Sequence, residues 1–387
     1  MTRRLGTLLA PILLALLFTP VPGALAAARR AAPAVCSWVQ MASRNNGATA
    51  NELNSVAALS ASNVWSVGEY FAGSNATKTL IEHWNGKTWK IVRSPNAGTG
   101  DSLFAVYAIS PANLWAVGSY YNGSTGRTLI EHWNGKVWKI VWSPNIGAGA
   151  NELRSVRGTS AGDIWAVGDA ITSYPVSKTV ILHWAGSRWQ LADSPSVPSA
   201  TNLLFGVRPA APAEAWAVGN YSTLAGSKTL VLHWTKRHWR VVPSPNGGTV
   251  SNVLTGVLAT SAANAWAVGY YYNGSADRTL VLHWNGRHWL KSFSPNTGPA
   301  DSDDIHAIGA TSPANVYAVG SAYHGAGSAV LITHWNGSHW RVLPGRNPGS
   351  GFNILNSIFA LSARSIWAVG VTSVKGGPNR TLIEHCR

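Results

Sequence analysis

A unit of 49 to 51 residues, repeated seven times, constrains this chain more than any other feature of its sequence. Each copy has a Val-Gly pair two residues after an aromatic residue, and all copies but the last continue to a His-Trp pair. Seven copies at near-constant spacing predict seven equivalent structural units. The valines of the Val-Gly pairs are Val67, Val117, Val167, Val218, Val268, Val319 and Val369.

Each unit has the pattern of four short strands. In the first copy, the runs 53–59, 64–67, 79–84 and 89–92 are apolar and rich in β-branched and aromatic residues, without helical periodicity. Four copies place Asn-Gly between the third and fourth runs, a pair suited to a type I′ hairpin between antiparallel neighbours. In a β-propeller, four-stranded antiparallel sheets, the blades, are arranged radially around a central channel. The sequence therefore predicts an all-β, seven-bladed β-propeller.

The two ends of the chain complement each other. The last copy stops at Arg387 without a fourth strand, and residues 38–45 match residues 89–96, the fourth strand of the first copy. We therefore expect the N-terminal strand to complete the C-terminal blade and close the ring. Aligned on the hairpin, Cys36 and Cys386 flank its turn and face each other at about 5.5 Å, which is within disulfide range. The sequence predicts a Cys36–Cys386 disulfide.

The first 26 residues have the pattern of a secretory signal peptide. A basic start precedes the apolar run 5–18, and small residues mark a cleavage site near Ala26. A twin-arginine signal is an alternative export route. We expect residues 27–35 to be a short disordered lead-in, residues 36–387 to form one propeller, and the mature protein to be extracellular. No second apolar stretch reaches the roughly 18 residues needed to span a bilayer.

Most of the 20 tryptophans, and one histidine per copy, recur at fixed places in the repeat. A residue required at the same place in every blade is best explained by packing or hydrogen bonding. Equivalent histidines of neighbouring blades are expected to lie too far apart to bind one metal ion, whose ligands lie at about 2 Å. The sequence therefore predicts no metal site, and no cofactor is called for.

Tyrosines gather in the connections between the second and third strands, which should share one face of the propeller with the blade-to-blade connections. Beside them lie Asn, Ser, Gly and Thr, a composition typical of recognition surfaces, and planar rings suit a carbohydrate. The alternative is that these tyrosines cap the hairpins and shield the sheets. The candidate residues of this loop face are Tyr70, Tyr120, Tyr121, Tyr174, Tyr221, Tyr270, Tyr271, Tyr272, Tyr323, Arg127 and Arg278.

Positive charge favours a different ligand. Without residues 1–26 the chain has 28 basic and 15 acidic side chains, a formal charge of +13, and six copies carry a basic residue at the start of the third strand. This ring would attract an anionic envelope polymer. The first strand should line the central channel, where an anion could bind; the candidate residues are Arg154, Arg157, Arg208 and His306. The acidic run 301–304 hints at a cation but lacks the spacing of a calcium loop, so solvated acids are the simpler explanation.

The regularity of the repeat argues against an enzyme. Catalysis needs an asymmetric constellation of groups, and no copy carries an insertion, a Gly-x-Ser-x-Gly motif or a His-Glu-x-x-His motif. We expect a secreted binding module that recognises an extracellular polymer, either a carbohydrate or an anionic envelope polymer, through the loop face. A protein-protein interaction scaffold is the first alternative, because Tyr and Arg also mark protein interfaces. A glycan-active hydrolase or lyase is the second.

The repeat also resembles a known group of proteins. Units such as 63–68 (Asn-Val-Trp-Ser-Val-Gly) and 79–89 look like those of uncharacterised secreted bacterial seven-bladed propellers, loosely similar to the kelch and galactose-oxidase group. The similarity covers Cys36 to Arg387 and implies the fold and export. The kelch glycine doublet, the Trp-Asp ending of WD repeats and the sialidase Asp box are missing, so the resemblance implies no catalytic residues.

Overall fold

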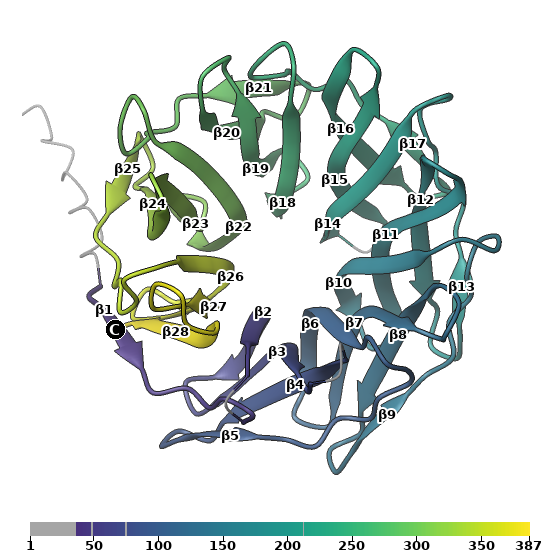
Figure 1. Cartoon of the computed structure of the whole chain (residues 1–387). Helices are drawn as coiled ribbons and strands as arrows, with labels where there is room; N and C mark the ends of the chain where they lie inside the picture. The colour runs from purple at the N-terminus through teal and green to yellow at the C-terminus, as the bar shows by residue number, and fades with distance from the viewer. Residues whose placement is uncertain (1–35, 48, 74–75, 212) are drawn as a thin grey trace, which may run out of the picture. The chain divides into compact units, whose positions relative to one another are not determined.

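The computed structural model describes residues 36–387 except 48, 74–75 and 212, and the predicted signal peptide and lead-in lie outside this range. All regular secondary structure in the described part is β-strand. The strands form seven four-stranded antiparallel sheets, the blades, around a central opening (Figure 1). The predicted seven-bladed propeller is therefore confirmed. No helix in the described part could cross a membrane.

The first four blades contain four consecutive strands each. Blade 1 consists of β2 (Asn51–Ser60), β3 (Asn63–Phe71), β4 (Thr77–Trp84) and β5 (Trp89–Ile91). Blade 2 consists of β6 (Ser102–Ser110), β7 (Asn113–Tyr121), β8 (Gly126–Trp133) and β9 (Trp138–Ile140). Blade 3 consists of β10 (Asn151–Ser160), β11 (Asp163–Ser173), β12 (Val176–Trp184) and β13 (Trp189–Leu191). Blade 4 consists of β14 (Thr201–Ala211), β15 (Glu214–Thr223), β16 (Gly226–Thr235) and β17 (His238–Val241).

The last three blades follow the same order until the chain ends. Blade 5 consists of β18 (Asn252–Ser261), β19 (Asn264–Tyr272), β20 (Asp277–Trp284) and β21 (Trp289–Ser292). Blade 6 consists of β22 (Ser302–Ser312), β23 (Asn315–His324), β24 (Gly327–Trp335) and β25 (Trp340–Leu343). Blade 7 consists of β26 (Asn353–Ser362), β27 (Ser365–Thr372), β28 (Arg380–Cys386) and, from the other end of the chain, β1 (Trp38–Met41).

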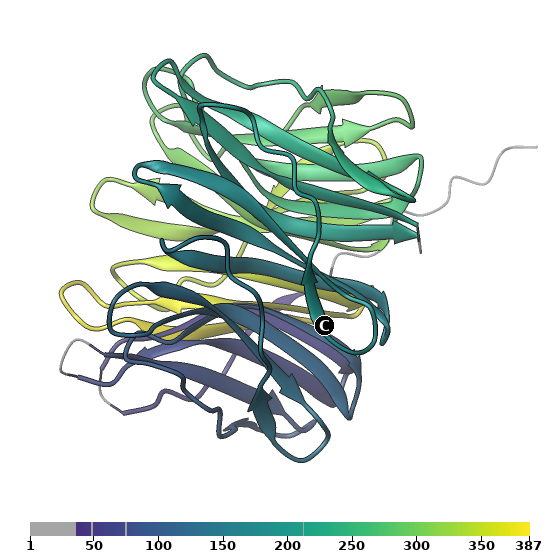
Figure 2. The same ribbon diagram turned by 90° about the vertical axis from the view of Figure 1, so that its right-hand side faces the viewer.

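Successive strands alternate in direction, so the connections lie on two opposite faces (Figure 2). The loop face carries the connections between the second and third strands and those between blades. The turn face carries the short turns between the first and second strands and between the third and fourth. The first strand of every blade lies beside the central opening (Figure 1) and runs from the loop face to the turn face.

The Asn-Gly hairpins differ from the predicted type I′ turn. Gly86 has a φ of +91°, but Asn85 is not among the residues with positive φ, which a type I′ turn requires at both positions. The Asn85 carboxamide oxygen instead accepts hydrogen bonds from the backbone N–H groups of Lys87 and Thr88, both at 3.0 Å. The side chain stabilises the turn, so Asn85 needs no left-handed backbone.

A β-bulge in the first strand of every blade explains the Val-Gly repeat. In blade 1 the register shifts between Leu53 and Ser55, and the other six blades shift at the equivalent place. A β-carbon on Gly68 would collide with the backbone oxygen of Glu52, and the other six Val-Gly glycines face the equivalent oxygen. None of the seven has a positive φ, so close approach of the bulged strand requires glycine at this position.

Tryptophans fill the spaces between blades. Trp65 of blade 1 stacks on His83 of its own blade with ring centroids 4.2 Å apart, and it contacts Trp133 and Trp138 of blade 2 at 5.0 and 5.8 Å. Five of the other interfaces repeat this cluster with Trp115, Trp165, Trp216, Trp266 and Trp367. The repeated tryptophans therefore pack between sheets, as the sequence predicts.

The repeated histidines hold these tryptophans in place. His83 Nε2 lies 2.9 Å from the side-chain oxygen of Asn63, the residue that begins the second strand of the same blade. Asn113, Asp163, Glu214, Asn264 and Asn315 play the same part in blades 2 to 6. Burial lowers the pKa of His83, which favours the neutral ring that stacks on Trp65. The polar residue that begins the second strand is therefore the hydrogen-bond partner of the repeated histidine.

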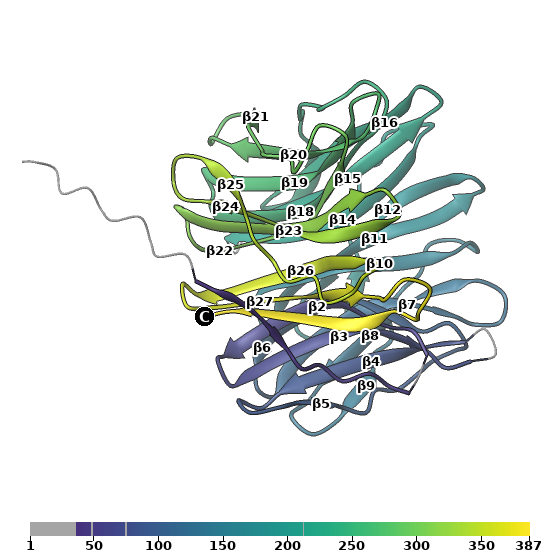
Figure 3. The same ribbon diagram turned by 60° about the vertical axis from the view of Figure 1, so that its left-hand side comes forward.

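The N-terminal strand closes the ring. β1 pairs with β28 in antiparallel register and completes blade 7 (Figures 1 and 3). The Cys36–Cys386 disulfide joins this strand to the last one, with Cα atoms 5.3 Å apart, so both predictions are confirmed. The expectation that Cys36 directly faces Cys386 is wrong, because Trp38 takes that register position and Cys36 lies two residues before it.

Replacing both Cys36 and Cys386 by serine is expected to lower the free energy of unfolding by at most about 5 kcal/mol, since the bond closes a very long loop in the unfolded chain. Guanidinium unfolding followed by tryptophan fluorescence measures the change. Reduced wild-type protein serves as the control and should match the double variant. An unchanged midpoint in both samples would show that β1 holds the seam without the disulfide.

Three buried glutamates join blades 6, 7, 1 and 2. Glu82 accepts a hydrogen bond from the backbone N–H of Arg44 at 3.0 Å, and Glu384 accepts one from that of Arg346 at 3.0 Å. Glu131 accepts one from the Ser94 hydroxyl at 2.8 Å. Each donor lies in the connection from the preceding blade. Burial raises the pKa of Glu82 and Glu131 to about 8 and that of Glu384 to about 7.

Above about pH 7, where the histidines are neutral in both the folded and the unfolded chain, the protein is therefore expected to lose stability as the pH rises. The folded pKa values lie above the ordinary value of 4.5, so the fold retains protons that the unfolded chain releases between pH 4.5 and about 8. The stabilisation is complete below pH 4.5 and is lost through about pH 8, at most about 5 kcal/mol for each of Glu82 and Glu131. Urea midpoints at pH 7, 8 and 9 measure the trend.

A Glu131→Gln variant provides the control for this trend. It should match the wild type near pH 5 and exceed it at pH 9, because the amide keeps the shape and cannot ionise. Parallel curves for the two proteins would contradict the assignment of the effect to this carboxyl group.

Candidate functional site

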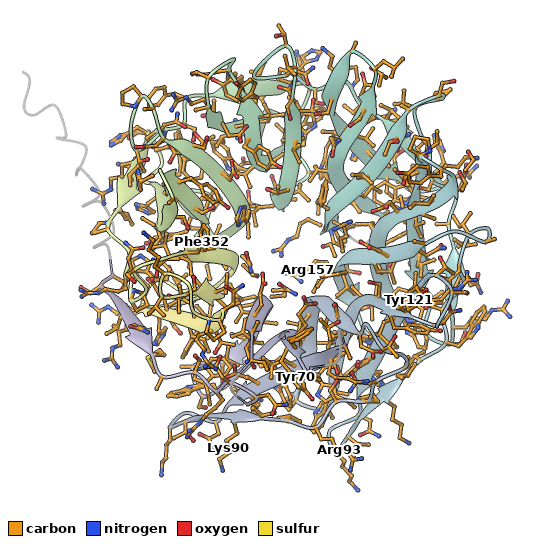
Figure 4. All side chains as sticks on the ribbon, in the orientation of Figure 1. Tyr70, Lys90, Arg93, Tyr121, Arg157 and Phe352 are labelled. Carbon is orange, nitrogen blue, oxygen red and sulfur yellow. A yellow bond between two sulfur atoms is a disulfide. The ribbon has the colours of Figure 1, made fainter. Side chains whose placement is uncertain are left out.

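The predicted loop-face tyrosines fall into two groups. Four of them occupy one column of the repeat, two residues after the Val-Gly pair, and pack against the apolar clusters between blades: Tyr70, Tyr120, Tyr221 and Tyr271. These rings contribute to the scaffold, as the alternative interpretation of the sequence holds, although Tyr70 also lines a hollow on the loop face. Figure 4 marks Tyr70 on blade 1 and Tyr121 on blade 2.

The other five tyrosines are more varied. Tyr174 and Tyr121 are 90% and 43% exposed, which leaves them open to a ligand. The hydroxyl of Tyr272 donates to the backbone oxygen of Gly274 at 2.9 Å. Burial raises the pKa of Tyr270 to about 12, with further contributions from Asp304, Asp277 and Tyr323, so these groups lie near one another at the junction of blades 5 and 6.

The basic ring at the start of the third strand fastens the connections between blades. Arg278 donates to the backbone oxygens of Gly298 and Asp301 at 2.7 and 3.1 Å. Arg127 reaches the oxygen of Gly147 at 3.5 Å, and Lys78 reaches that of Gly98 at 2.9 Å. Every one of these oxygens belongs to the connection leading to the next blade. These basic side chains, which the sequence indicates as candidate ligands of a polyanion, therefore use some of their N–H donors within the protein.

A hollow of about 510 Å³ lies on the loop face of blade 1, and we call it the blade 1 hollow. It lies where β2 begins, β3 ends and β4 begins. Its lining combines two aromatic side chains, two carboxyl groups and polar neighbours: Tyr70, Phe71, Glu52, Glu69, Ala50, Asn51, Thr77 and Asn379. No Lys or Arg lines this hollow among the described residues.

The two carboxyl groups of the blade 1 hollow occupy opposite positions on adjacent strands. Glu52 pairs with Glu69 in the register of β2 and β3. Burial raises the pKa of both groups, and the charge of Glu69 raises that of Glu52 further. Glu52 accepts a hydrogen bond from the Asn356 carboxamide at 3.0 Å, whereas Glu69 Oε2 is buried with no hydrogen-bond partner among the described residues. Two carboxyl groups whose pKa is raised by burial therefore border the hollow.

The central channel is lined by the residues of the seven bulges and their neighbours, with a volume of about 610 Å³. Because a bulge turns its extra residue out of the pleat, these side chains enter the channel or reach the next blade. Four of them hydrogen-bond to a backbone oxygen of the next blade: Asn54, Thr255, His306 and Asn356. His306 Nδ1 donates to Leu355, and burial lowers the pKa of this ring. The structure thus gives this predicted channel residue a structural contact.

Arg154 is fully neutralised within its own blade. Its guanidinium lies 2.7 Å from a carboxylate oxygen of Glu152 and 3.1 Å from one of Asp169. The same group lies over the rings of Phe104 and Phe205, 6.0 and 5.1 Å from their centroids, so cation–π contact adds to the two ion pairs. An anion entering the channel would compete with two carboxylates for Arg154.

Arg157 and Arg208 have a different environment. Arg157 Nη1 donates to the backbone oxygens of Val106 and Val156, both at 2.9 Å, and Figure 4 shows this residue at the central opening. Burial and, to a lesser extent, the charge of Arg208 together lower the pKa of Arg157 to about 10. Neither side chain forms an ion pair among the described residues. The channel arginines predicted together thus divide into one neutralised group and two groups without a counter-ion.

The acidic run 301–304 is used within the fold. Asp303 accepts a hydrogen bond from the backbone N–H of Thr297 at 2.9 Å, and Asp301 lies 2.8 Å from His324 Nδ1. No group of three or more His, Cys, Asp or Glu among the described residues could hold a metal ion. The hint of a cation site in this run has no support in the geometry.

A change of Arg154 to Gln is expected to destabilise the protein by about 2–4 kcal/mol, because Glu152 and Asp169 would lose a shared, half-buried counter-ion. Thermal unfolding of the variant measures the loss. The same change at exposed Arg364 is the control and should leave the midpoint within a degree or two. Equal midpoints for both variants would contradict the structural role of Arg154.

Comparison with known proteins supports the fold and identifies no function. No family model and no curated protein matches the chain. YCF48 bound to a D1 peptide aligns with a TM-score of 0.54 at 16% identity, over 91% of this chain and 96% of that chain. A protein of unknown function from Dyadobacter fermentans aligns with a TM-score of 0.53 at 11% identity, over 90% and 98%. An ulvan lyase of polysaccharide lyase family PL25 aligns with a TM-score of 0.51 at 9% identity, over 83% and 89%.

These identities are too low to carry function, so the similarity shows the fold alone. The alignments cover 96%, 98% and 89% of the three chains, so the similarity extends over the whole propeller and is not limited to one blade. The resemblance to secreted bacterial and kelch-like propellers stays a prediction from the sequence.

Proposed function

We propose that this protein is a secreted binding module that recognises a neutral, hydroxyl-rich carbohydrate through the blade 1 hollow. One observation carries the proposal. Two aromatic residues, Tyr70 and Phe71, line one hollow together with Glu52 and Glu69, and no Lys or Arg lines it among the described residues. Sugar rings present apolar faces to aromatic side chains and hydroxyl groups to polar ones, so this composition suits them.

The charges of the hollow favour a neutral glycan over an anionic polymer. Glu52 and Glu69 line it without a Lys or Arg beside them, and both have a raised pKa because burial disfavours their charged forms. A carboxylated or sulfated polymer would add like charge to this place, which costs free energy. The basic side chains of the loop face fasten loop backbone, which weakens the case for a polyanion further.

Export is part of the proposal. The pattern of residues 1–26 predicts a signal peptide, and these residues lie outside the described range. The Cys36–Cys386 disulfide is compatible with an oxidising compartment, where such bonds persist.

The proposal is tested by calorimetric titration of the protein with soluble neutral, acidic and sulfated oligosaccharides at low and high salt. We expect salt-resistant binding to a neutral glycan, weakened about tenfold by Phe71→Ala through loss of one aromatic contact. Tyr174→Ala removes a highly exposed tyrosine outside the hollow, and it should bind as the wild type does. Binding only to polyanions at low salt would overturn the proposal.

A second candidate function is cleavage of the same glycan, favoured by the adjacent carboxyl groups of Glu52 and Glu69, because glycosidases use such a pair. Release of soluble product from a polysaccharide, lost in Glu69→Gln, would establish it. Silence across all glycans, with capture of a secreted protein instead, would favour the interaction scaffold. The ulvan lyase is a polysaccharide lyase, which fits the cleavage alternative, and YCF48 was solved with a bound peptide, which fits the scaffold, although similarity at this level supports neither.

A further inference from the structure

We propose that the half of the central channel nearer the turn face contains an oxyanion-binding site formed by the guanidinium groups of Arg157 and Arg208. The site is separate from the blade 1 hollow and does not rest on the function proposed for it. Both residues line the channel and come three positions after the bulge residues Arg154 and Phe205, on strands that run toward the turn face. Blades 3 and 4 are neighbours, so the two groups share one side of the channel.

The two guanidinium groups lie close enough to repel each other. The charge of Arg208 lowers the pKa of Arg157, and both charges act on Tyr107, the residue at the same level in blade 2. Tyr107 is itself fixed, because its hydroxyl donates to the backbone oxygen of Gly158 at 2.8 Å. Two like charges in a partly desolvated channel raise the free energy of the unliganded fold, and a bound anion would remove that penalty.

The carboxyl groups nearby are already occupied. Asp163, whose charge reaches Tyr107, lies 2.7 Å from His183 Nε2 and accepts a hydrogen bond from Thr159 at 2.5 Å. Glu152 and Asp169 are paired with Arg154. No carboxylate among the described residues forms an ion pair with Arg157 or Arg208, so both charges lack a counter-ion there.

The hydrogen-bonding groups of the pair are arranged for an oxyanion. Arg157 Nη1 is held by two backbone oxygens, which fixes its guanidinium and leaves its other nitrogens without a hydrogen-bond partner among the described residues. Arg208 has no hydrogen-bond partner among them. Guanidinium groups bind carboxylate, sulfate and phosphate through paired N–H donors, and a fixed group loses little conformational freedom on binding. The ligand class is therefore an oxyanion, free or as the charged group of a larger molecule.

The test is calorimetric titration of the full mature protein with sodium sulfate, sodium phosphate and sodium acetate, at constant ionic strength set with sodium chloride. We expect a saturable heat with a stoichiometry near one for at least one of the three. Arg208→Gln should weaken that binding at least tenfold, since one of two charged donors is lost. Arg93→Gln, an exposed arginine on the outer rim (Figure 4), is the matched control and should bind as the wild type does.

The stability of the variant gives an independent readout. In chloride alone, Arg208→Gln should unfold at the wild-type temperature or above it, because it relieves repulsion and breaks no hydrogen bond. A general salt effect on stability would raise the midpoints of all three proteins equally, whereas the site predicts a larger rise for the wild type and Arg93→Gln. No saturable heat with any anion, or equal affinity in Arg208→Gln, would overturn the proposal.

Discussion

Aromatic packing holds neighbouring blades of the propeller together, because the backbone hydrogen bonds between strands end at the edge of each sheet. Trp65 and its counterparts each contact two tryptophans of the next blade, and a histidine of the same blade stacks on the other side. The interface of blades 6 and 7 is the exception. There Tyr317 meets Trp38 at 6.4 Å, and Cys386 stands where the other blades have a second tryptophan. The disulfide thus lies at the interface where the aromatic cluster is incomplete.

The repeat also has columns in which the residue type varies, and both candidate sites include such positions. The bulge that brings each first strand against the Val-Gly glycine is the same in all seven blades, but five different residue types occupy it. Asn54 and Asn356 use the position to bind the next blade, whereas Arg154 uses it to gather two carboxylates and two aromatic rings. Identical backbone geometry therefore supports both structural contacts and chemically distinct channel walls.

The seven blades, the closing strand and the disulfide could be predicted because each follows from spacing along the chain. The turn at Asn85 could not, since the side chain replaces the backbone conformation that Asn-Gly usually signals. In the sequence, the tyrosines in the column of Tyr70 look like a recognition surface. The sequence of one repeat shows neither that the Tyr70 ring packs between blades nor that a hollow lies beside it. Arg154 and Arg157 look alike in sequence, and only the fold shows which of them has a counter-ion.

The two candidate sites have opposite electrostatic character, and the same physical cause produces both. Desolvation raises the pKa of Glu52 and Glu69 at the loop face and lowers that of Arg157 in the channel. In both sites, burial therefore disfavours the charged form of the side chains. A ligand relieves this penalty only if it brings the complementary group: hydroxyl donors for the carboxyl pair, an oxyanion for the arginines. A long polyanion crossing the loop face would meet the glutamates as like charge, whereas a small anion in the channel need not pass over the blade 1 hollow. The positive net charge of the chain therefore says little about what either site binds, because local desolvation and pairing decide it.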